Sequence, residues 1–485
     1  MKTTEISPRA PRRRSAAASL CAACLGIGLA ACTTADPNAS FQAVVVAVKP
    51  HLDAQLEWAR SDAERTASRT RVDELLARPI TAEAAVQIAL LGHRGLQAAF
   101  DELEIAEADR VRALSLPNPG IGIARSRRGD EIELETGIHF NLARLLALPL
   151  AREVESQRIA QLQAEIALQT LTLASDVRKA WIQAVTAEET LGYARQVNEA
   201  AEASAELARR MASAGNFNRL QQAREQAFQA DAALALARAE QLQRASRERL
   251  NRLMGLWGGQ LAYSLPNRLP ELPSSLPERM DIESVAIAQR LDVQAARIHV
   301  ERTARALGLT RATRFVNVFE LGTKRESSNE ALDKRTWEIG FELPIFDSGE
   351  ARLMRAEAVY RQALNRAAET AIAARSETRE AYFAARSHWD IARYHRMQLV
   401  PLRQRIAEEN LLRYNGMLIG VFELLADART QIAGVNAAIE AARDYWLAQA
   451  DLDMALIGKP ALTGPRTPTA ALNPATAAAP HAGAH

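Results

Sequence analysis

The residue types that could carry out chemistry are scattered along this chain of 485 residues rather than gathered into motifs. Its eight histidines form no His-Glu-x-x-His helix, and no glycine-rich phosphate-binding loop is present. His388, His395 and Met397 lie on one long helical segment, and His481 and His485 lie in a Pro- and Ala-rich tail. Isolated ligands of this kind are more often solvated than bound to a metal. We therefore expect no catalytic residues, no metal site and no cofactor.

The three cysteines all lie within the first 32 residues, where the pattern is that of an export signal. A basic stretch at residues 9–14 precedes a largely apolar run that ends in Leu29-Ala30-Ala31-Cys32. This ending is typical of a bacterial lipoprotein signal, in which the cysteine is acylated and becomes the new N-terminus. We predict a signal peptide over residues 1–31, lipidation at Cys32 and a lipidated N-terminal segment over residues 32–80. Signal cleavage without lipid is the alternative, and no disulfide is expected.

The composition narrows the class of protein. Sixty basic and 58 acidic side chains give a net charge of +2, which provides no basic face for nucleic acid. After the signal, no run of 18 uncharged apolar residues occurs, so membrane-spanning helices are excluded, while the weaker pattern of a membrane β-barrel is not. Long stretches rich in Ala, Leu, Glu, Gln and Arg predict long helices instead.

An internal repeat is the most informative feature of the chain. The segment from Ser175 to Trp181 aligns with the segment from Ser376 to Tyr382, and the same offset places Gly215 on Gly416. We therefore predict a duplicated unit over residues 81–262 and 281–458, joined by a Pro-rich linker over 263–280. A disordered tail is expected over 459–485.

Each repeat has the same predicted order of elements. In the first, a helix over 81–115 is followed by two strands, a helix over 150–214 and a helix over 218–254. The helices of the second repeat are predicted over 281–311, 350–415 and 418–457. Because such helices are too long for a compact core, we expect them to pack side by side as a coiled-coil-like wall. A rod without a lumen is the simplest alternative.

The strand segments favour a channel over a rod. Apolar residues alternate with polar ones from Glu131 to Leu142 and again from Thr336 to Leu343, which is the period of a strand with one apolar face. Partner strands are predicted over 120–126 and 315–323, with polar loops over 127–130 and 324–334. A half-exposed soluble sheet has the same alternation. In lipid, however, four strands leave open edges, so several chains must combine their strands, and three would supply twelve.

At this point the chain resembles the TolC-like outer-membrane efflux and secretion channels, the outer membrane factors. The resemblance rests on the duplicated helix and strand order, on the segment from Leu343 to Gly349, and on Arg413-Tyr414-Asn415-Gly416. It covers about residues 80–458, but the first repeat lacks the Phe-Asp-Ser-Gly of residues 346–349. It implies a mainly α fold with a small β part: a trimeric, twelve-stranded β-barrel in the outer membrane, continued by a periplasmic α-helical coiled-coil barrel.

The resemblance also implies a function and its partners. The protein would be the passive exit duct of a tripartite efflux system, served by an inner-membrane transporter through a periplasmic adaptor protein. It would be a homotrimer, anchored in outer-membrane lipid and extending into the periplasm, and it would not be an enzyme. Drugs, metal ions and proteins all remain possible cargoes. The alternative is a periplasmic coiled-coil scaffold or adaptor lipoprotein without a pore.

Two groups of residues are the candidate sites of such a duct. The long helices are predicted to turn at Gly215 and Gly416, where glycine allows a left-handed helix cap and the close approach of a neighbouring backbone. These turns at the far ends of the helical hairpins are predicted to dock the adaptor, and they comprise Ala214, Gly215, Asn216, Asn415, Gly416 and Met417. Glu423 and Asp427 share a helix face beyond the second turn and would recur three times around a narrow opening as a periplasmic gate. Arg429 is expected to pair with a neighbour and lock the closed state. A plain turn and a solvated helix face are the respective alternatives.

Overall fold

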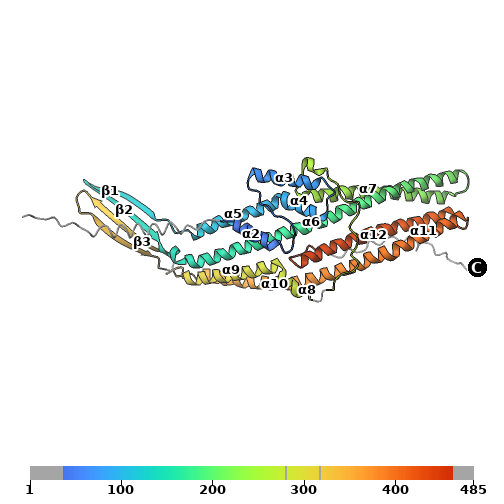
Figure 1. Ribbon diagram of the computed structural model, residues 1–485. Coiled ribbons are helices and arrows are strands. Elements are labelled where there is room, and N and C mark those ends of the chain that lie inside the picture. The colour runs from blue at the N-terminus through green and yellow to red at the C-terminus, as the bar shows by residue number, and fades with distance from the viewer. Residues whose placement is uncertain (1–35, 279–280, 316–317, 344, 463–485) are drawn as a thin grey trace, which may run out of the picture. The chain divides into compact units, whose positions relative to one another are not determined.

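The computed structural model describes residues 36–278, 281–315, 318–343 and 345–462 (Figure 1). The predicted signal peptide, Cys32 and nearly all of the predicted tail therefore lie outside the described residues. By its contacts the chain divides into two compact units. Unit 1 contains the described residues up to 174, together with 251–264 and 291–372, and unit 2 contains 175–250, 265–290 and the described residues from 373 onward.

Helices dominate both units, as predicted. The elements in chain order are α2 (Pro37–Val48), α3 (Asp62–Leu76), α4 (Ala82–Gly92), α5 (Arg94–Leu114), β1 (Gly120–Arg128), β2 (Glu131–Asn141), α6 (Leu142–Ser213), α7 (Arg219–Met254), η1 (Gly258–Leu261), α8 (Ile282–Gln289), α9 (Leu291–Thr313), β3 (Phe319–Ser328), β4 (Lys334–Phe341), α10 (Glu350–Tyr394), the π-helical turn η2 (His395–Leu399), α11 (Val400–Asn415) and α12 (Val421–Ala455). Among the described residues, no helix is both long enough and apolar enough to cross a membrane.

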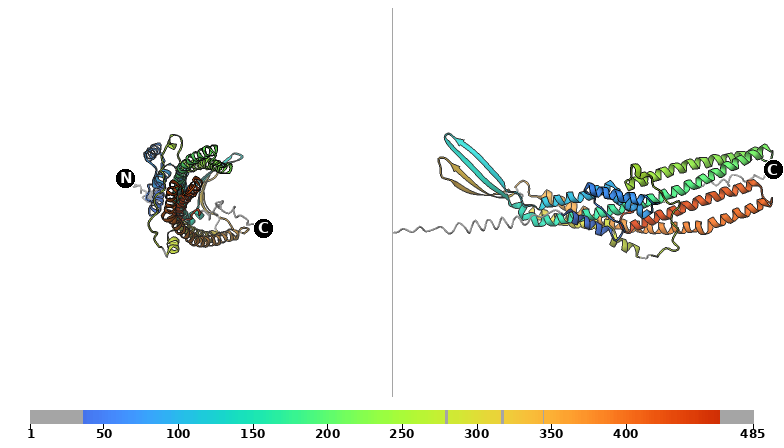
Figure 2. Two further views of the ribbon diagram at one scale, coloured as in Figure 1. Left: turned by 90° about the vertical axis from the view of Figure 1, so that its right-hand side faces the viewer. Right: turned by 45° about the horizontal axis from the view of Figure 1, so that its top comes forward.

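The strands of unit 1 form one antiparallel sheet in the order β1-β2-β3-β4. Its two hairpins lie side by side in Figures 1 and 2, because β2 pairs with β3 although they are far apart in sequence. The predicted strands are present, but the predicted loops were too long. β1 continues to Arg128, and Lys324 belongs to β3 rather than to a loop. β3 also begins at Phe319 rather than at 315. The strand residues 127–128 and 324–328, which the prediction missed, are all charged or polar, so no apolar alternation marked them as strand.

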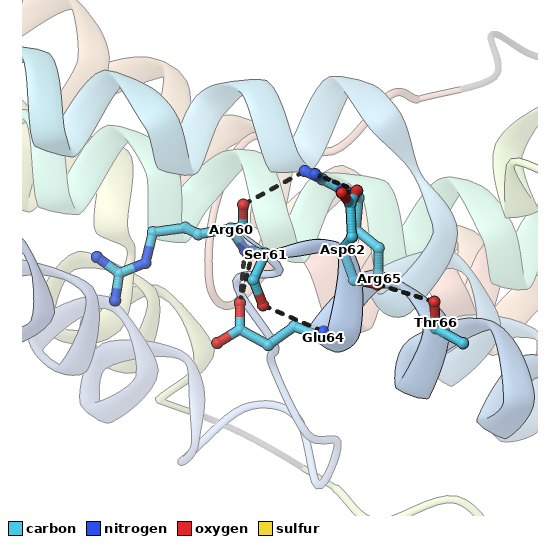
Figure 3. A network of polar contacts seen from close by, with 6 residues as sticks. All are labelled: Arg60, Ser61, Asp62, Glu64, Arg65 and Thr66. Carbon is cyan, nitrogen blue, oxygen red and sulfur yellow. Dashed lines mark hydrogen bonds and ion pairs between the residues drawn. The ribbon is translucent and has the colours of Figure 1, made fainter.

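The segment before the first predicted repeat is folded, which the sequence had not indicated. Helix α3 begins at a capping box, in which Ser61 accepts a hydrogen bond from the Glu64 N–H and Glu64 accepts one from the Ser61 N–H (Figure 3). Helix α2 packs against α5 through the edge-on contact of Phe41 with Phe100. The buried hydroxyl of Ser40 donates a 2.8 Å hydrogen bond to Glu107. The contacts of Phe41 and Ser40 hold the N-terminal segment against α5 within unit 1.

The predicted helix over 81–115 is in fact two helices, α4 and α5, that break at His93. Nδ1 of His93 accepts the N–H of Leu96 and so caps α5. Partial burial lowers the pKa of His93, which keeps this nitrogen able to accept. A Cβ on Gly255, which follows α7, would lie 2.7 Å from the carbonyl oxygen of Gly92, so the close approach requires glycine.

A second unpredicted break separates α8 from α9 at Arg290 in unit 2. This side chain is only 1% exposed, and its guanidinium lies 2.8 Å from a carboxylate oxygen of Glu377. It also donates to the carbonyl oxygen of Ala455, the last residue of α12, as does the hydroxyl of Thr378. A helix C-terminus has unpaired carbonyl groups, so these two side chains cap α12.

Two further helix boundaries differ from those predicted. Helix α6 begins at Leu142, directly after β2, rather than at 150, and Pro149 lies within it. The predicted start at 150 was therefore too late, and the junction that departs from the family pattern is helical. The predicted helix over 350–415 is interrupted by the wider turn η2 before Pro401, which lies in the first turn of α11.

Candidate functional site

The two faces of the sheet differ in chemistry, as the alternation predicted. The apolar face is formed by Ile121, Ile132, Leu134, Ile138, Phe140, Phe319, Leu321, Trp337, Ile339 and Phe341, and it becomes basic near the hairpin loops. The polar face carries Glu135, Lys324 and Glu338 side by side. The ammonium of Lys324 lies 3.2 Å from Glu135 and 3.1 Å from Glu338. One lysine on β3 therefore links the carboxylates of the two strands that flank it, β2 and β4.

A shallow cavity of about 390 Å³ lies over the polar face. Glu135, His139, Glu320, Lys324 and Glu338 line it. One glycine from each of the four strands also lines it, namely Gly122, Gly137, Gly322 and Gly340, and the missing side chains leave the space. The face is thus concave, polar and richer in carboxylates than in cations. It can attract a hydrated cation, but no cluster of His, Cys, Asp or Glu in the described chain could hold a bound metal ion.

The first hairpin of unit 2 turns at Ala214, Gly215 and Asn216, which are all exposed. Gly215 adopts a left-handed φ of +79°. The Asn216 N–H bonds to the carbonyl of Met211, and the Gly215 N–H bonds to that of Ala212. This pair of bonds is the Schellman motif, so the role predicted for Gly215 as a left-handed helix cap is confirmed.

The second hairpin turns at Asn415, Gly416 and Met417 and uses the same motif one position later. The Leu418 N–H bonds to the carbonyl of Arg413, and the Met417 N–H bonds to that of Tyr414. Gly416 has an ordinary φ of −81°, and Met417 is the left-handed residue, with φ +58°. The expectation that Gly416 supplies the left-handed cap is therefore wrong, because α11 continues through Asn415 and the cap moves to the next residue.

The predicted gate carboxylates lie on the first two turns of α12. Glu423 is exposed and Asp427 is half-buried. Neither carboxylate is paired with a cation within the described part of the chain. Their charges are therefore available to ions or to a neighbouring chain.

The structure brings Arg429 to partners that the sequence reasoning missed. Its guanidinium lies 2.5 Å from a carboxylate oxygen of Glu225 on α7, and it covers the ring of Phe228 at 4.5 Å. Glu225 is fully buried and also accepts a 2.7 Å hydrogen bond from the hydroxyl of Ser204 on α6. Arg429 thus connects α12 to the hairpin of α6 and α7. A glutamate among the polar residues of α7 gave no sequence signal of this role.

Comparison with known proteins identifies the fold. No protein-family model matches the chain. It is 24% identical over 287 residues to the cobalt-zinc-cadmium resistance protein CzcC of Cupriavidus metallidurans, a match that covers 57% of this chain and 66% of the relative.

Solved structures match over more of the chain. The CmeC outer membrane channel of Campylobacter jejuni superimposes with a TM-score of 0.66 at 18% identity, covering 80% of this chain and 87% of that one. The outer membrane protein VceC of Vibrio cholerae has a TM-score of 0.65 at 16% identity, covering 80% and 97%. The predicted fold, that of the TolC-like outer membrane factors with a mainly helical chain and a small sheet, is therefore confirmed.

Proposed function

We propose that the protein is the outer-membrane exit duct of a tripartite efflux system and conducts cargo passively. The observation that supports this most directly is the sheet, whose one face is apolar and whose other face is concave and acidic. An apolar exterior and a wet interior are what a porin-type barrel requires. A scaffold lipoprotein without a pore has no use for such a sheet, although it remains the alternative.

The duct is a homotrimer in this proposal. The sheet ends at β1 and β4, whose outer edges have no partner strand among the described residues. Unpaired backbone groups in lipid cost several kcal/mol each, so the edges must join those of other copies. Three copies give twelve strands, with the helices continuing into the periplasm and Cys32 carrying the lipid anchor. We also retain the interpretation of residues 81–262 and 281–458 as a duplication.

The two hairpin turns are the proposed docking surface for a periplasmic adaptor, which would couple the duct to an inner-membrane transporter. Exposed apolar side chains support this assignment, because Met417 is 94% and Leu418 75% exposed, and Leu220 lies exposed beside the first turn. Apolar side chains gathered at exposed turns are typical of binding surfaces. Ala214, Gly215 and Asn216 provide the small, close-approach part of the same surface.

Glu423 and Asp427 are proposed to form the gate at the periplasmic end. Their free carboxylates would form acidic rings in a trimer, which favour cations and disfavour anions. The contact of Arg429 with Glu225 is proposed to hold α12 against α7 in the closed state. Both features stand on α12 just beyond the second turn.

Divalent metal cations are the cargo that we favour. The name of the relative CzcC states resistance to cobalt, zinc and cadmium. The acidic lining of the sheet, including Glu135, Glu320 and Glu338, suits cations in transit. Drugs and proteins are the alternative cargoes.

Single-channel recording in planar bilayers tests the proposal. Purified full-length protein should show discrete, cation-selective conductance, which trivalent cations block from the periplasmic side. The variant E423Q/D427N should conduct more and resist this block, because the acidic rings are gone. An absence of conductance from protein that is monomeric in detergent would reject the duct and favour the scaffold. Unchanged block in the variant would reject only the gate assignment.

A further inference from the structure

The apolar face of the sheet becomes strongly basic toward the hairpin loops, and nothing in the proposed duct uses this charge. The register places four arginines on that face: Arg125, Arg127, Arg325 and Arg335. All four are exposed. No acidic residue of any of the strands lies on the same face, because every strand glutamate has the opposite parity. We call these four residues the arginine belt.

The two faces differ in their cations: the cations of the apolar face are all arginines, whereas the polar face carries both strand lysines and one arginine, Arg128. Lys324 and Lys334, the lysines of the strands, lie on the polar face, where they pair with glutamates. Each is followed in sequence by an arginine of the belt. Arginine offers a planar fork that binds phosphate oxygens in pairs, whereas lysine acts as a point charge. The belt therefore has the side chain suited to phosphate.

Within the belt, Arg325 and Arg335 are directly opposite each other on β3 and β4. Like charges at opposite positions of a strand pair destabilise the sheet unless a counter-charge is near. The carboxylate of Asp333, in the loop between the strands, pairs with Arg325. The guanidiniums of Arg125 and Arg335 have no carboxylate partner among the described residues. The belt thus has more cations than the chain neutralises.

The position of the belt indicates what supplies the missing anions. Next to it along the strands lies an apolar band that includes Ile121, Ile138 and Trp337, while Ile132 and Leu134 of β2 lie at the level of the belt itself. In a lipid bilayer, an apolar band of this kind lies in the hydrocarbon, and a tryptophan is typical of the boundary. The residues immediately beyond it face the lipid headgroups, whose phosphates carry the negative charge.

We propose that the arginine belt binds phosphate-bearing lipid headgroups of the outer leaflet. This inference depends on the proposed function in one respect, since the sheet must be inserted with its loops at the outer surface. A small anion in transit is not the ligand, because the belt lies on the face opposite the polar lining. Bound headgroups would neutralise the opposed arginines and fix the depth of the sheet in the membrane.

The test measures lipid retention by native mass spectrometry of the full chain released from a non-ionic detergent. The probes are diphosphorylated lipid A, the same lipid without phosphates, and phosphatidylcholine. The chain offers a matched pair of variants, R325Q/R335Q on the belt and K324Q/K334Q on the polar face. The substituted residues are neighbours in sequence, and each variant removes two positive charges. We expect lipid A affinity to fall on the order of fivefold for each belt arginine removed. The lysine variant should bind lipid A as the wild type does.

Three results would overturn the proposal: equal loss in both variants, equal binding of the lipid without phosphates, or full displacement of lipid A by millimolar inorganic phosphate. The variant R325K/R335K keeps the charge and should retain part of the affinity, which guards against a folding defect. Conductance of R325Q/R335Q is recorded on the same protein. Normal conductance with normal lipid A binding rejects the belt but leaves the duct, whereas absent conductance in the wild type rejects the duct itself.

Discussion

Met417 combines a strained backbone with an almost fully exposed side chain. A left-handed conformation costs a residue with a Cβ roughly 1–2 kcal/mol, and Gly215 avoids this cost at the equivalent turn. Gly416 is adjacent but has an ordinary φ, so the chain has its glycine one residue before the position that needs it. Backbone strain of this kind is typical of functional sites. We expect the function of the Met417 side chain to be contact with the adaptor.

Replacing Met417 should therefore separate stability from docking. In M417G the amides of residues 417 and 418 should exchange hydrogen about fivefold more slowly, since about 1 kcal/mol of strain is removed. G215A should have the opposite effect on the first turn. G416A is the matched control, because a Cβ there meets its nearest atom at 3.5 Å and the φ is normal. Faster exchange in M417G, or weaker exchange protection in G416A than in G215A, would contradict this account.

Adaptor binding is the second property to measure on the same variants. M417G should bind the adaptor more weakly than the wild type, since the exposed side chain is lost although the turn is more stable. Retained adaptor binding would mean that Met417 is strained without a docking role.

At the scale of elements, the periodic features were predictable and the breaks were not. The alternation of apolar and polar residues identified the strands, because successive side chains of a strand point to opposite faces. The break at Arg290 has neither glycine nor proline beside it, and the one at His93 has only Gly92 and Gly95. Each break depends on a partner distant in sequence, such as the C-terminus of α12 beside Arg290. Glu225 was missed for the same reason, since only folding brings it to Arg429. The start of α6 was predicted too late, because the helix begins directly after β2 and continues through Pro149.

The contact between α7 and α12 makes a prediction about gating. The single variant R429L should lower the thermal unfolding midpoint strongly, because a buried unpaired carboxylate costs roughly 3–5 kcal/mol. The double variant E225L/R429L removes both charges, so it should recover most of the stability while its conductance rises, since nothing charged holds α12 against α7. The stability of both variants is measured by thermal unfolding, and their conductance by single-channel recording.

The control for this prediction is another buried ion pair of unit 2. Lys179 and Asp451 are both nearly inaccessible and pair within the helices away from the turns. The variant K179M/D451L should change stability but leave conductance unaltered. If it opens the channel as far as E225L/R429L does, the effect is a general loosening of the helices and not a lock at α12.

At the scale of the whole molecule, the single chain is incomplete in one specific respect. Its sheet has two edges, at β1 and β4, and its apolar face has no covering layer among the described residues. Isolated edge strands of this length promote uncontrolled association, and closing the sheet with further copies removes the edges altogether. The helices have no such requirement, because their backbone groups are paired within each helix. Oligomerisation should therefore depend on the sheet.

If oligomerisation depends on the sheet, the protein should be a trimer, and a substitution in an edge strand should dissociate it. The full-length protein in detergent should elute as a single trimer by light scattering. Replacing Ile123 of β1 by proline should reduce the trimer, because proline cannot donate to a strand ladder and stiffens the edge. The substitution A214P, in the turn between α6 and α7, is the control for introducing a proline outside the sheet, and it should leave a trimer. A wild-type monomer, or equal dissociation of both variants, would show that the strands do not make the assembly, and the duct would then need another origin for its closed wall.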